Sequence, residues 1–156
     1  MLDLTPITLN ETARVMGFDF GTRYIGIAVG TGLMGAQPCT SLLAKDGVPN
    51  WSEVKKIIDE WYPVCLVVGI PLHMDDSEQQ LTRAAKRFMQ QLNGEFNLPV
   101  YGCDELLSTK EARAFLFETH GAKGLKKSAI DSYSAKIILD TWLGMQQFRD
   151  GNLPLK

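Results

Sequence analysis

The chain has 156 residues, of which 45% are hydrophobic and 22% are charged, and its formal net charge is −2; this size suits one domain with a single core. No apolar run approaches the roughly 20 residues that a membrane-spanning helix needs, and the first residues lack the pattern of a secretory signal, so we expect no membrane partner. The negative net charge disfavours nucleic acid as a partner, although the local field at a site matters more than the total charge.

We predict a flexible N-terminal arm over residues 1–14, a single domain over residues 15–147 and a tail over residues 148–156. The cysteines, Cys39, Cys65 and Cys103, match no zinc-binding spacing, and their odd number argues against a disulfide framework. Cys65 and Cys103 stand in apolar strand-like runs, which indicates buried, reduced thiols and a cytoplasmic protein.

Residues 15–30 predict two strands joined by a tight turn at residues 21–22. In the first strand Asp19 shares a face with Gly17, while bulky side chains take the other face. In the second strand small residues also share one face, beginning with Gly26. If these small residues flank Asp19, that face has room for a ligand.

Helices and strands alternate through the rest of the domain. We expect, in order, a strand over residues 36–44, a helix capped by Asn50 with Glu53, a buried strand over residues 64–70, a helix that opens at Ser77 with Gln80 and ends near Gly94, a strand over residues 99–104, a helix capped by Ser108 with Glu111, a loop over residues 120–127, and a last helix that starts at Ser128 with Asp131. An antiparallel opening followed by crossover helices predicts an α/β fold, with a five-stranded mixed sheet and helices on both faces.

Acidic residues stand at three places that such a sheet can bring together at one edge. Asp19 lies in the first strand, Asp104 and Glu105 end the fifth, and Asp131 lies near the start of the last helix. Each position has an ordinary alternative: a turn residue, a solvated loop, and a carboxylate that caps a helix start. Gathered together, the carboxylates would repel one another unless a cation held them ionised. Oxygen ligands suit Mg²⁺ or Mn²⁺, and two such ions would balance three carboxylates and one phosphodiester in a two-metal site.

A basic segment precedes Asp131. Residues 110–127 contain only two acids, Glu111 and Glu118. The same segment contains five cations: Lys110, Arg113, Lys123, Lys126 and Lys127. This segment is either a solvated face or a phosphate-binding surface.

Four sequence blocks resemble, in the same order, the signature blocks of the YqgF family, which includes RuvX-type proteins. The blocks are FDFGTRYIGIAVG (residues 18–30), VVGIPLHMDDSEQ (67–79), DELLSTKEAR (104–113) and IDSYSA (130–135). The resemblance implies a ribonuclease-H-like fold and a metal-dependent endonuclease, a hydrolase that cleaves phosphodiester bonds by a two-metal-ion mechanism.

The resemblance also implies the ligands and the substrate. It places Mg²⁺ or Mn²⁺ on Asp19, Glu105 and Asp131, and so selects Glu105 over Asp104. The implied substrate is structured RNA, in 5′-end maturation of pre-16S rRNA; the alternative is branched DNA, in the resolution of Holliday junctions. The protein would be a monomer or a homodimer, and a resolvase would act as a symmetric dimer. We further expect five basic residues to bind nucleic acid: Arg23, Lys110, Arg113, Lys126 and Lys127.

The third block departs from the family pattern at Leu106, where Arg usually follows the acidic pair. If that Arg contacts phosphate in the family, Lys110 and Arg113 would replace it here. Alternatively, the enzyme cleaves more slowly, or its active site is partly decayed. A non-catalytic RNA-binding module is therefore a further alternative. Nucleotide binding is another, because residues 19–22 with Gly26 also resemble the phosphate loop of actin-like ATPases. Those proteins, however, bind ATP between two such domains, and this chain holds one.

Overall fold

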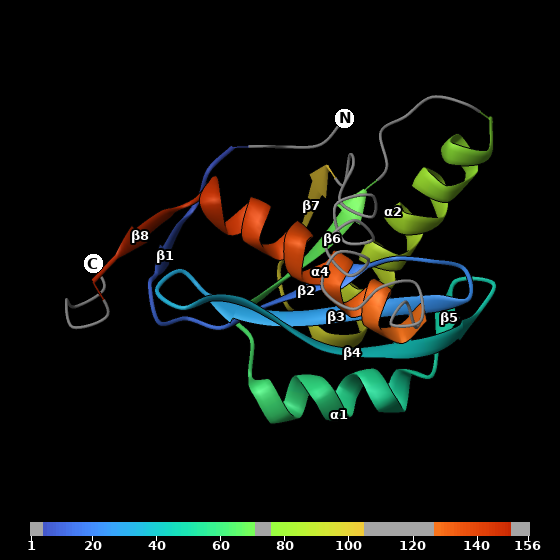
Figure 1. Cartoon of the computed structure of the whole chain (residues 1–156), viewed down its shortest axis with the longest axis horizontal. Coiled ribbons are helices and arrows are strands. Elements are labelled where there is room, and N and C mark those ends of the chain that lie inside the picture. Colours follow the sequence, from blue (N-terminus) through green and yellow to red (C-terminus); the bar gives the residue numbers. More distant parts are fainter. Residues whose placement is uncertain (1–4, 71–75, 105–126, 151–156) are drawn as a thin grey trace, which may run out of the picture.

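The computed structural model describes residues 5–70, 76–104 and 127–150, which fold into an α/β domain (Figure 1). A six-stranded sheet has the strand order β5-β4-β3-β2-β6-β7, and a separate two-stranded sheet pairs β1 with β8. The described elements are, in chain order, β1 (Thr8–Asn10), β2 (Val15–Asp19), β3 (Tyr24–Thr31), β4 (Gly35–Lys45), β5 (Val48–Pro49), α1 (Trp51–Trp61), β6 (Cys65–Ile70), α2 (Asp76–Phe96), β7 (Val100–Asp104), α4 (Lys127–Gly144) and β8 (Gln147–Arg149).

The mixed sheet with helices on both faces is confirmed, but the prediction of five strands is wrong. β5 joins the main sheet after a turn in which Asp46 and Gly47 have φ of 52° and 82°, and its two residues are too few to show alternation. β1 and β8 pair in parallel, residues 8–10 beside residues 147–149. The segments expected as an arm and a tail therefore contribute to a strand each, and no local pattern reveals a pairing between chain ends.

The strand directions bring several strand ends to one edge of the sheet. Because the acidic site is predicted there, this edge is named the functional edge. β2, β3 and β4 are antiparallel neighbours, whereas β6 pairs in parallel with β2 and β7 pairs in parallel with β6. The carboxyl ends of β2, β6 and β7 therefore lie at the same edge, together with the amino end of β3. The sequence predicts the acidic site at this edge.

Two hydrophobic cores lie on opposite faces of the sheet. Phe18 of β2 contacts Phe88 of α2 edge-to-face, with ring centroids 5.6 Å apart, in the core that α1 and α2 cover. Leu139 and Trp142 of α4 fill the other core. α4 crosses the strands on the side opposite to α1 (Figure 1).

α4 packs directly on the small residues of β2 and β3. A side-chain carbon added at Gly17 would lie 2.9 Å from Cβ of Leu139, and one added at Gly26 would overlap the carbonyl oxygen of Asp131. The expectation that this face leaves room for a ligand is therefore wrong. The missing side chains admit the backbone of a helix instead.

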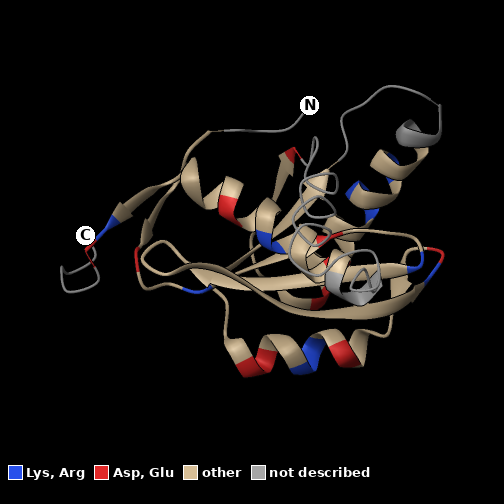
Figure 2. Cartoon of the chain, in the orientation of Figure 1, with Lys and Arg blue, Asp and Glu red and all other residues tan. Residues whose placement is uncertain are grey.

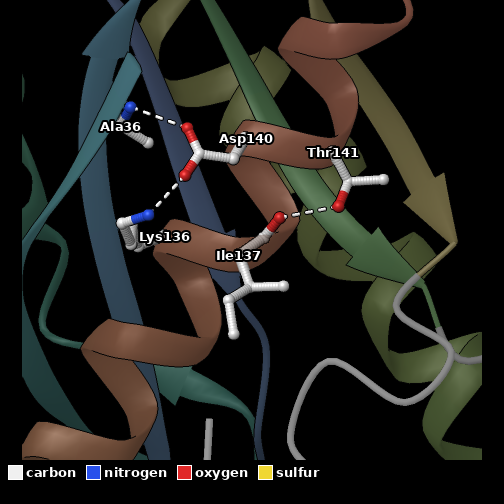
Figure 3. A network of polar contacts seen from close by, with 5 residues as sticks. All are labelled: Ala36, Lys136, Ile137, Asp140 and Thr141. Carbon is white, nitrogen blue, oxygen red and sulfur yellow. Dashed lines mark hydrogen bonds and ion pairs between the residues drawn. The ribbon is translucent and has the colours of Figure 1, made fainter. Parts of the chain in front are cut away.

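Polar contacts tie the second half of α4 to β4 (Figure 3). The Asp140 carboxylate accepts a hydrogen bond from the backbone nitrogen of Ala36 at 2.8 Å, and its other oxygen pairs with Nζ of Lys136 at 2.6 Å. Because Ala36 belongs to β4 and Asp140 to α4, the hydrogen bond between them holds the helix at a defined position along the sheet, while the ion pair with Lys136 lies within the helix.

The helix ends confirm some predictions and correct others. Asn50 caps α1, and its side chain accepts a hydrogen bond from the backbone nitrogen of Ser52 at 3.0 Å. α2 ends at Phe96, two residues beyond Gly94, near which its end was predicted. The Phe96 ring packs beside Trp51 of α1, with centroids 6.2 Å apart, so a tertiary contact carries the helix past the glycine.

The last helix starts at Lys127, one residue before the predicted start at Ser128, and the helix predicted from Ser108 lies outside the described residues. In the ranges that are described, no helix is both long enough and apolar enough to cross a membrane.

The cysteines confirm the expectation of buried thiols. Cys65 and Cys103 are free and buried, and Cys39 is free and half-buried. Burial raises the pKa of the Cys65 thiol to about 12, so this thiol is protonated at neutral pH.

We expect Gly26→Ala to lower the free energy of unfolding by about 1–3 kcal/mol. The added methyl group would clash with the backbone of α4, which can move only if the whole helix shifts. Gly17→Ala should lower the free energy of unfolding less, since the neighbouring atom belongs to a side chain that can move. Gly94→Ala is the control: nothing lies within 4 Å of an added carbon there, and alanine in a helix is favoured over glycine by about 0.5–1 kcal/mol. Urea denaturation measures all three variants, and equal changes at Gly26 and Gly94 would contradict the packing described.

Candidate metal and nuclease site

Asp19 ends β2 at the functional edge and is half-buried. Its cross-strand partner in β3 is Gly26, and the partner of Gly26 in β4 is Ser41. Paired residues of antiparallel strands direct their side chains to the same face of the sheet. Since the open side of Gly26 faces α4, Asp19 and Ser41 both project toward α4, one on each side of Gly26.

α4 brings Asp131 over the same row of residues. The side chain of Asp131 is buried, with only 6% of the residue exposed, and its backbone carbonyl oxygen lies against Gly26. The hydroxyl of Ser41 donates a hydrogen bond to Oδ2 of Asp131 at 3.5 Å. The structure thus brings Asp19 and Asp131, which are far apart in sequence, to one face of the sheet.

The interpretation of Asp131 as a helix-capping carboxylate is wrong. α4 begins four residues earlier, at Lys127, and its first turn carries no acidic residue. Asp131 therefore lies beyond the free N–H groups that a capping carboxylate satisfies. Its hydrogen bond from Ser41 on β4 is a tertiary contact.

The third predicted ligand, Glu105, lies outside the described residues, but Asp104 before it ends β7 at the functional edge. Sγ of Cys103 donates to the carbonyl oxygen of Ile138 in α4 at 3.7 Å, which places Cys103 on the α4 face. Strand alternation therefore directs Asp104 to the face opposite from the other two carboxylates.

One of the predicted nucleic-acid-binding residues is described in full. Arg23 is exposed in the turn between β2 and β3, beside the end of β2 that carries Asp19. The side chains of the other four lie outside the described part: Lys110, Arg113, Lys126 and Lys127.

The ligand atoms that the structure gathers are the carboxylate oxygens of Asp19 and Asp131, and the Ser41 hydroxyl supports Asp131 by a hydrogen bond. Oxygen donors suit hard divalent cations such as Mg²⁺ or Mn²⁺, so the residues present fit the predicted metal by their chemistry. Within the described ranges, no three His, Cys, Asp or Glu side chains lie close enough together to hold a metal ion. The third predicted carboxylate stands outside those ranges.

Sequence reasoning did not find Ser41. This residue lies inside the predicted strand, where no neighbouring pattern distinguishes it from a surface serine. Its placement beside Gly26 depends on β3–β4 pairing that shifts register between Ile27 and Ala28, and its partner Asp131 is 90 positions away. A motif search has no signal for such a contact.

The fold defines an α/β domain of the ribonuclease-H-like class. A solved structure described as "T. thermophilus RuvC in complex with Holliday junction substrate" shares it, with a TM-score of 0.51 and 16% identity over 85% of this chain and 94% of that one. A family model described as "RuvX: Holliday junction resolvase" matches residues 13–145.

Curated relatives extend this likeness at much higher identity. A protein of Actinobacillus pleuropneumoniae serotype 5b named "Putative pre-16S rRNA nuclease" is 53% identical over 133 residues, which cover 85% of this chain and 97% of that protein. A protein of Proteus mirabilis with the same name is 51% identical, over 85% of this chain and 96% of that protein. The chain belongs to the RuvX family, as its resemblance to the YqgF blocks implied.

We expect the effect of Asp131→Asn on stability to change sign with magnesium. Without metal, removing one of several close carboxylates should be neutral or stabilising. Magnesium at ten times its dissociation constant should stabilise the wild type by about 1.4 kcal/mol, and the variant should lose most of this gain. Urea denaturation of the wild type and of Asp131→Asn, each in EDTA and in excess magnesium, gives the four free energies of unfolding that are compared.

Ser41→Ala is the matched control. It removes the hydrogen bond to Asp131, at a cost of about 0.5–1.5 kcal/mol, but it keeps the carboxylate. Its loss should be similar in EDTA and in magnesium. If Asp131→Asn behaves like Ser41→Ala, with one loss in both conditions, then Asp131 is a structural residue and not a metal ligand.

Proposed function

We propose that this protein is a metal-dependent endonuclease that hydrolyses a phosphodiester bond in the 5′-end maturation of pre-16S rRNA. The observation that carries the proposal is the position of Asp19 and Asp131 on one face of the sheet, at the edge where β7 leads into Glu105. The names of relatives about half identical over most of both chains support the substrate.

In this proposal Asp19, Glu105 and Asp131 hold two Mg²⁺ or Mn²⁺ ions, which would activate the attacking water and neutralise charge on the leaving oxygen. β2 positions Asp19 because β3 pairs with the strand up to Asp19 on one side and β6 pairs with it up to Phe18 on the other. Ser41 orients the carboxylate of Asp131 through its hydroxyl. The direction of Asp104, away from α4, favours Glu105 as the third ligand.

Basic residues around this edge would bind the phosphates that flank the cleaved bond. Arg23 stands in the turn after Asp19, and the remaining contacts would come from Lys110, Arg113, Lys126 and Lys127. Such contacts position the substrate without reading its bases. Maturation of ribosomal RNA in bacteria would place the protein in the cytoplasm, where its free, buried thiols would stay reduced.

Resolution of Holliday junctions is the second candidate function. The description of the matching family model favours it, and the same carboxylates would serve both reactions. The two functions differ in symmetry, since a resolvase cuts two equivalent strands and would act as a symmetric dimer. Solution mass, measured with and without a four-way DNA junction, separates a dimeric resolvase from a monomeric RNA nuclease.

We expect cleavage to require Mg²⁺ or Mn²⁺ and to fall by at least about a hundredfold in Asp19→Asn, on the scale of losing one electrostatic group from an active site. The substrates are a pre-16S leader RNA, a four-way DNA junction and single strands. Asp104→Asn is the control, because Asp104 lies at the same edge but on the opposite face of the sheet, and it should retain cleavage. Equal cleavage in EDTA would exclude the metal mechanism, and absence of cleavage of every substrate would leave a non-catalytic RNA-binding module.

A further inference from the structure

The exposed face of α2 carries a cluster of basic residues that the site does not use. Arg83, Lys86 and Arg87 are exposed, and residues 80–94 contain no Asp or Glu. The turns of α2 that stand clear of the sheet are marked by basic residues (Figure 2). Residues three and four apart are neighbours on a helix surface, so these three cations form one patch, the α2 patch.

On each of the other two described helices, one cation is paired with an acid of the same helix. Lys55 of α1 pairs with Asp59, and Lys136 of α4 pairs with Asp140. No ion pair joins any cation of the α2 patch to the part of the chain that the structure describes. Like charges four residues apart, as at Arg83 and Arg87, disfavour a helix. The patch therefore costs stability in the free protein, and a bound polyanion would reverse that cost.

The patch belongs to a helix that begins near the functional edge and covers the face of the sheet opposite to the one that carries Asp19 and Asp131. α2 follows β6, whose carboxyl end lies at the functional edge, and its buried face packs through Ala85, Phe88 and Leu92 into the core on the α1 side. The patch is thus anchored by a rigid, buried helix face. Its residues face solvent on the α1 side of the sheet, whereas Asp19 and Asp131 lie on the α4 side.

We propose that the α2 patch binds the phosphate backbone of an RNA double helix next to the cleaved bond. This proposal rests on the proposed function, because it takes the substrate to be a structured RNA. Three cations within about one helical turn can contact consecutive phosphates of a nucleic-acid backbone. Residues 80–94 contain no carboxylate that would repel those phosphates. Backbone contacts of this kind would hold a stem in register while the carboxylates reach the bond to be cut.

The test compares two adjacent basic pairs on two exposed helices. Lys86→Gln/Arg87→Gln removes two charges from the α2 patch, and Lys55→Gln/Lys56→Gln removes two from α1, whose residues are also exposed. Both are measured in the Asp19→Asn background, in which cleavage should be at least about a hundredfold slower, with a hairpin RNA over a series of salt concentrations. We expect the α2 variant to bind more weakly and the slope of log affinity against log salt to become shallower by about 1.8, because each neutralised phosphate accounts for about 0.9 of that slope.

The α1 variant should keep the slope of the parent, and Lys86→Arg, which preserves charge, should do so as well. Circular dichroism checks that each variant is folded. A slope that falls equally in the α1 and α2 variants would show a general charge effect, and an unchanged slope in both would show a solvated face; either overturns the α2 patch. Weaker binding to anionic vesicles with an unchanged RNA slope would overturn it too. Failure of the proposed function is seen separately, as absence of cleavage by the protein with Asp19 intact.

Discussion

At Gly26 the backbone of α4 comes so close to β3 that no side-chain carbon fits between them. This contact sets the distance of α4 from the sheet, and the position of Asp131 follows from it because its own carbonyl oxygen is the atom that touches Gly26. Asp140, two and a half turns later, fixes the height of the same helix through the backbone nitrogen of Ala36. The missing side chain therefore serves the approach of a helix, and the site lies around that contact.

The close packing of α4 on β3 also places negatively charged side chains in a largely buried environment. Asp131 is buried and Asp19 half-buried, on a face otherwise packed with apolar side chains. A carboxylate in such surroundings is costly unless other groups stabilise its charge. The Ser41 hydroxyl supplies one such group, and a divalent cation would supply far more, which is why a metal site is a physical solution for this arrangement.

Charge is distributed unevenly over the molecule, and the net value of −2 hides this. α1 and α4 contain internal ion pairs, whereas every charged residue of α2 between residues 80 and 94 is basic. The acidic groups of the candidate site and the basic groups of α2 thus occupy different surfaces. For the proposed nuclease, which would act on a polyanion through bound cations, such separation matters more than the total charge.

The sequence by itself determined the order and most bounds of the main strands, the Asn50 cap, the burial of Cys65 and Cys103, and membership of the family, because alternation, capping chemistry and motif blocks are local properties of the chain. It also singled out Asp19 and Asp131. Only the tertiary structure decided that Gly17 and Gly26 face a helix and not a ligand, that Ser41 meets Asp131, that Phe96 carries α2 past Gly94, and that the chain ends form a second sheet. Each of these depends on which surfaces meet in space, and residues 90 or more positions apart, such as Ser41 and Asp131, share no local pattern from which their contact could be predicted.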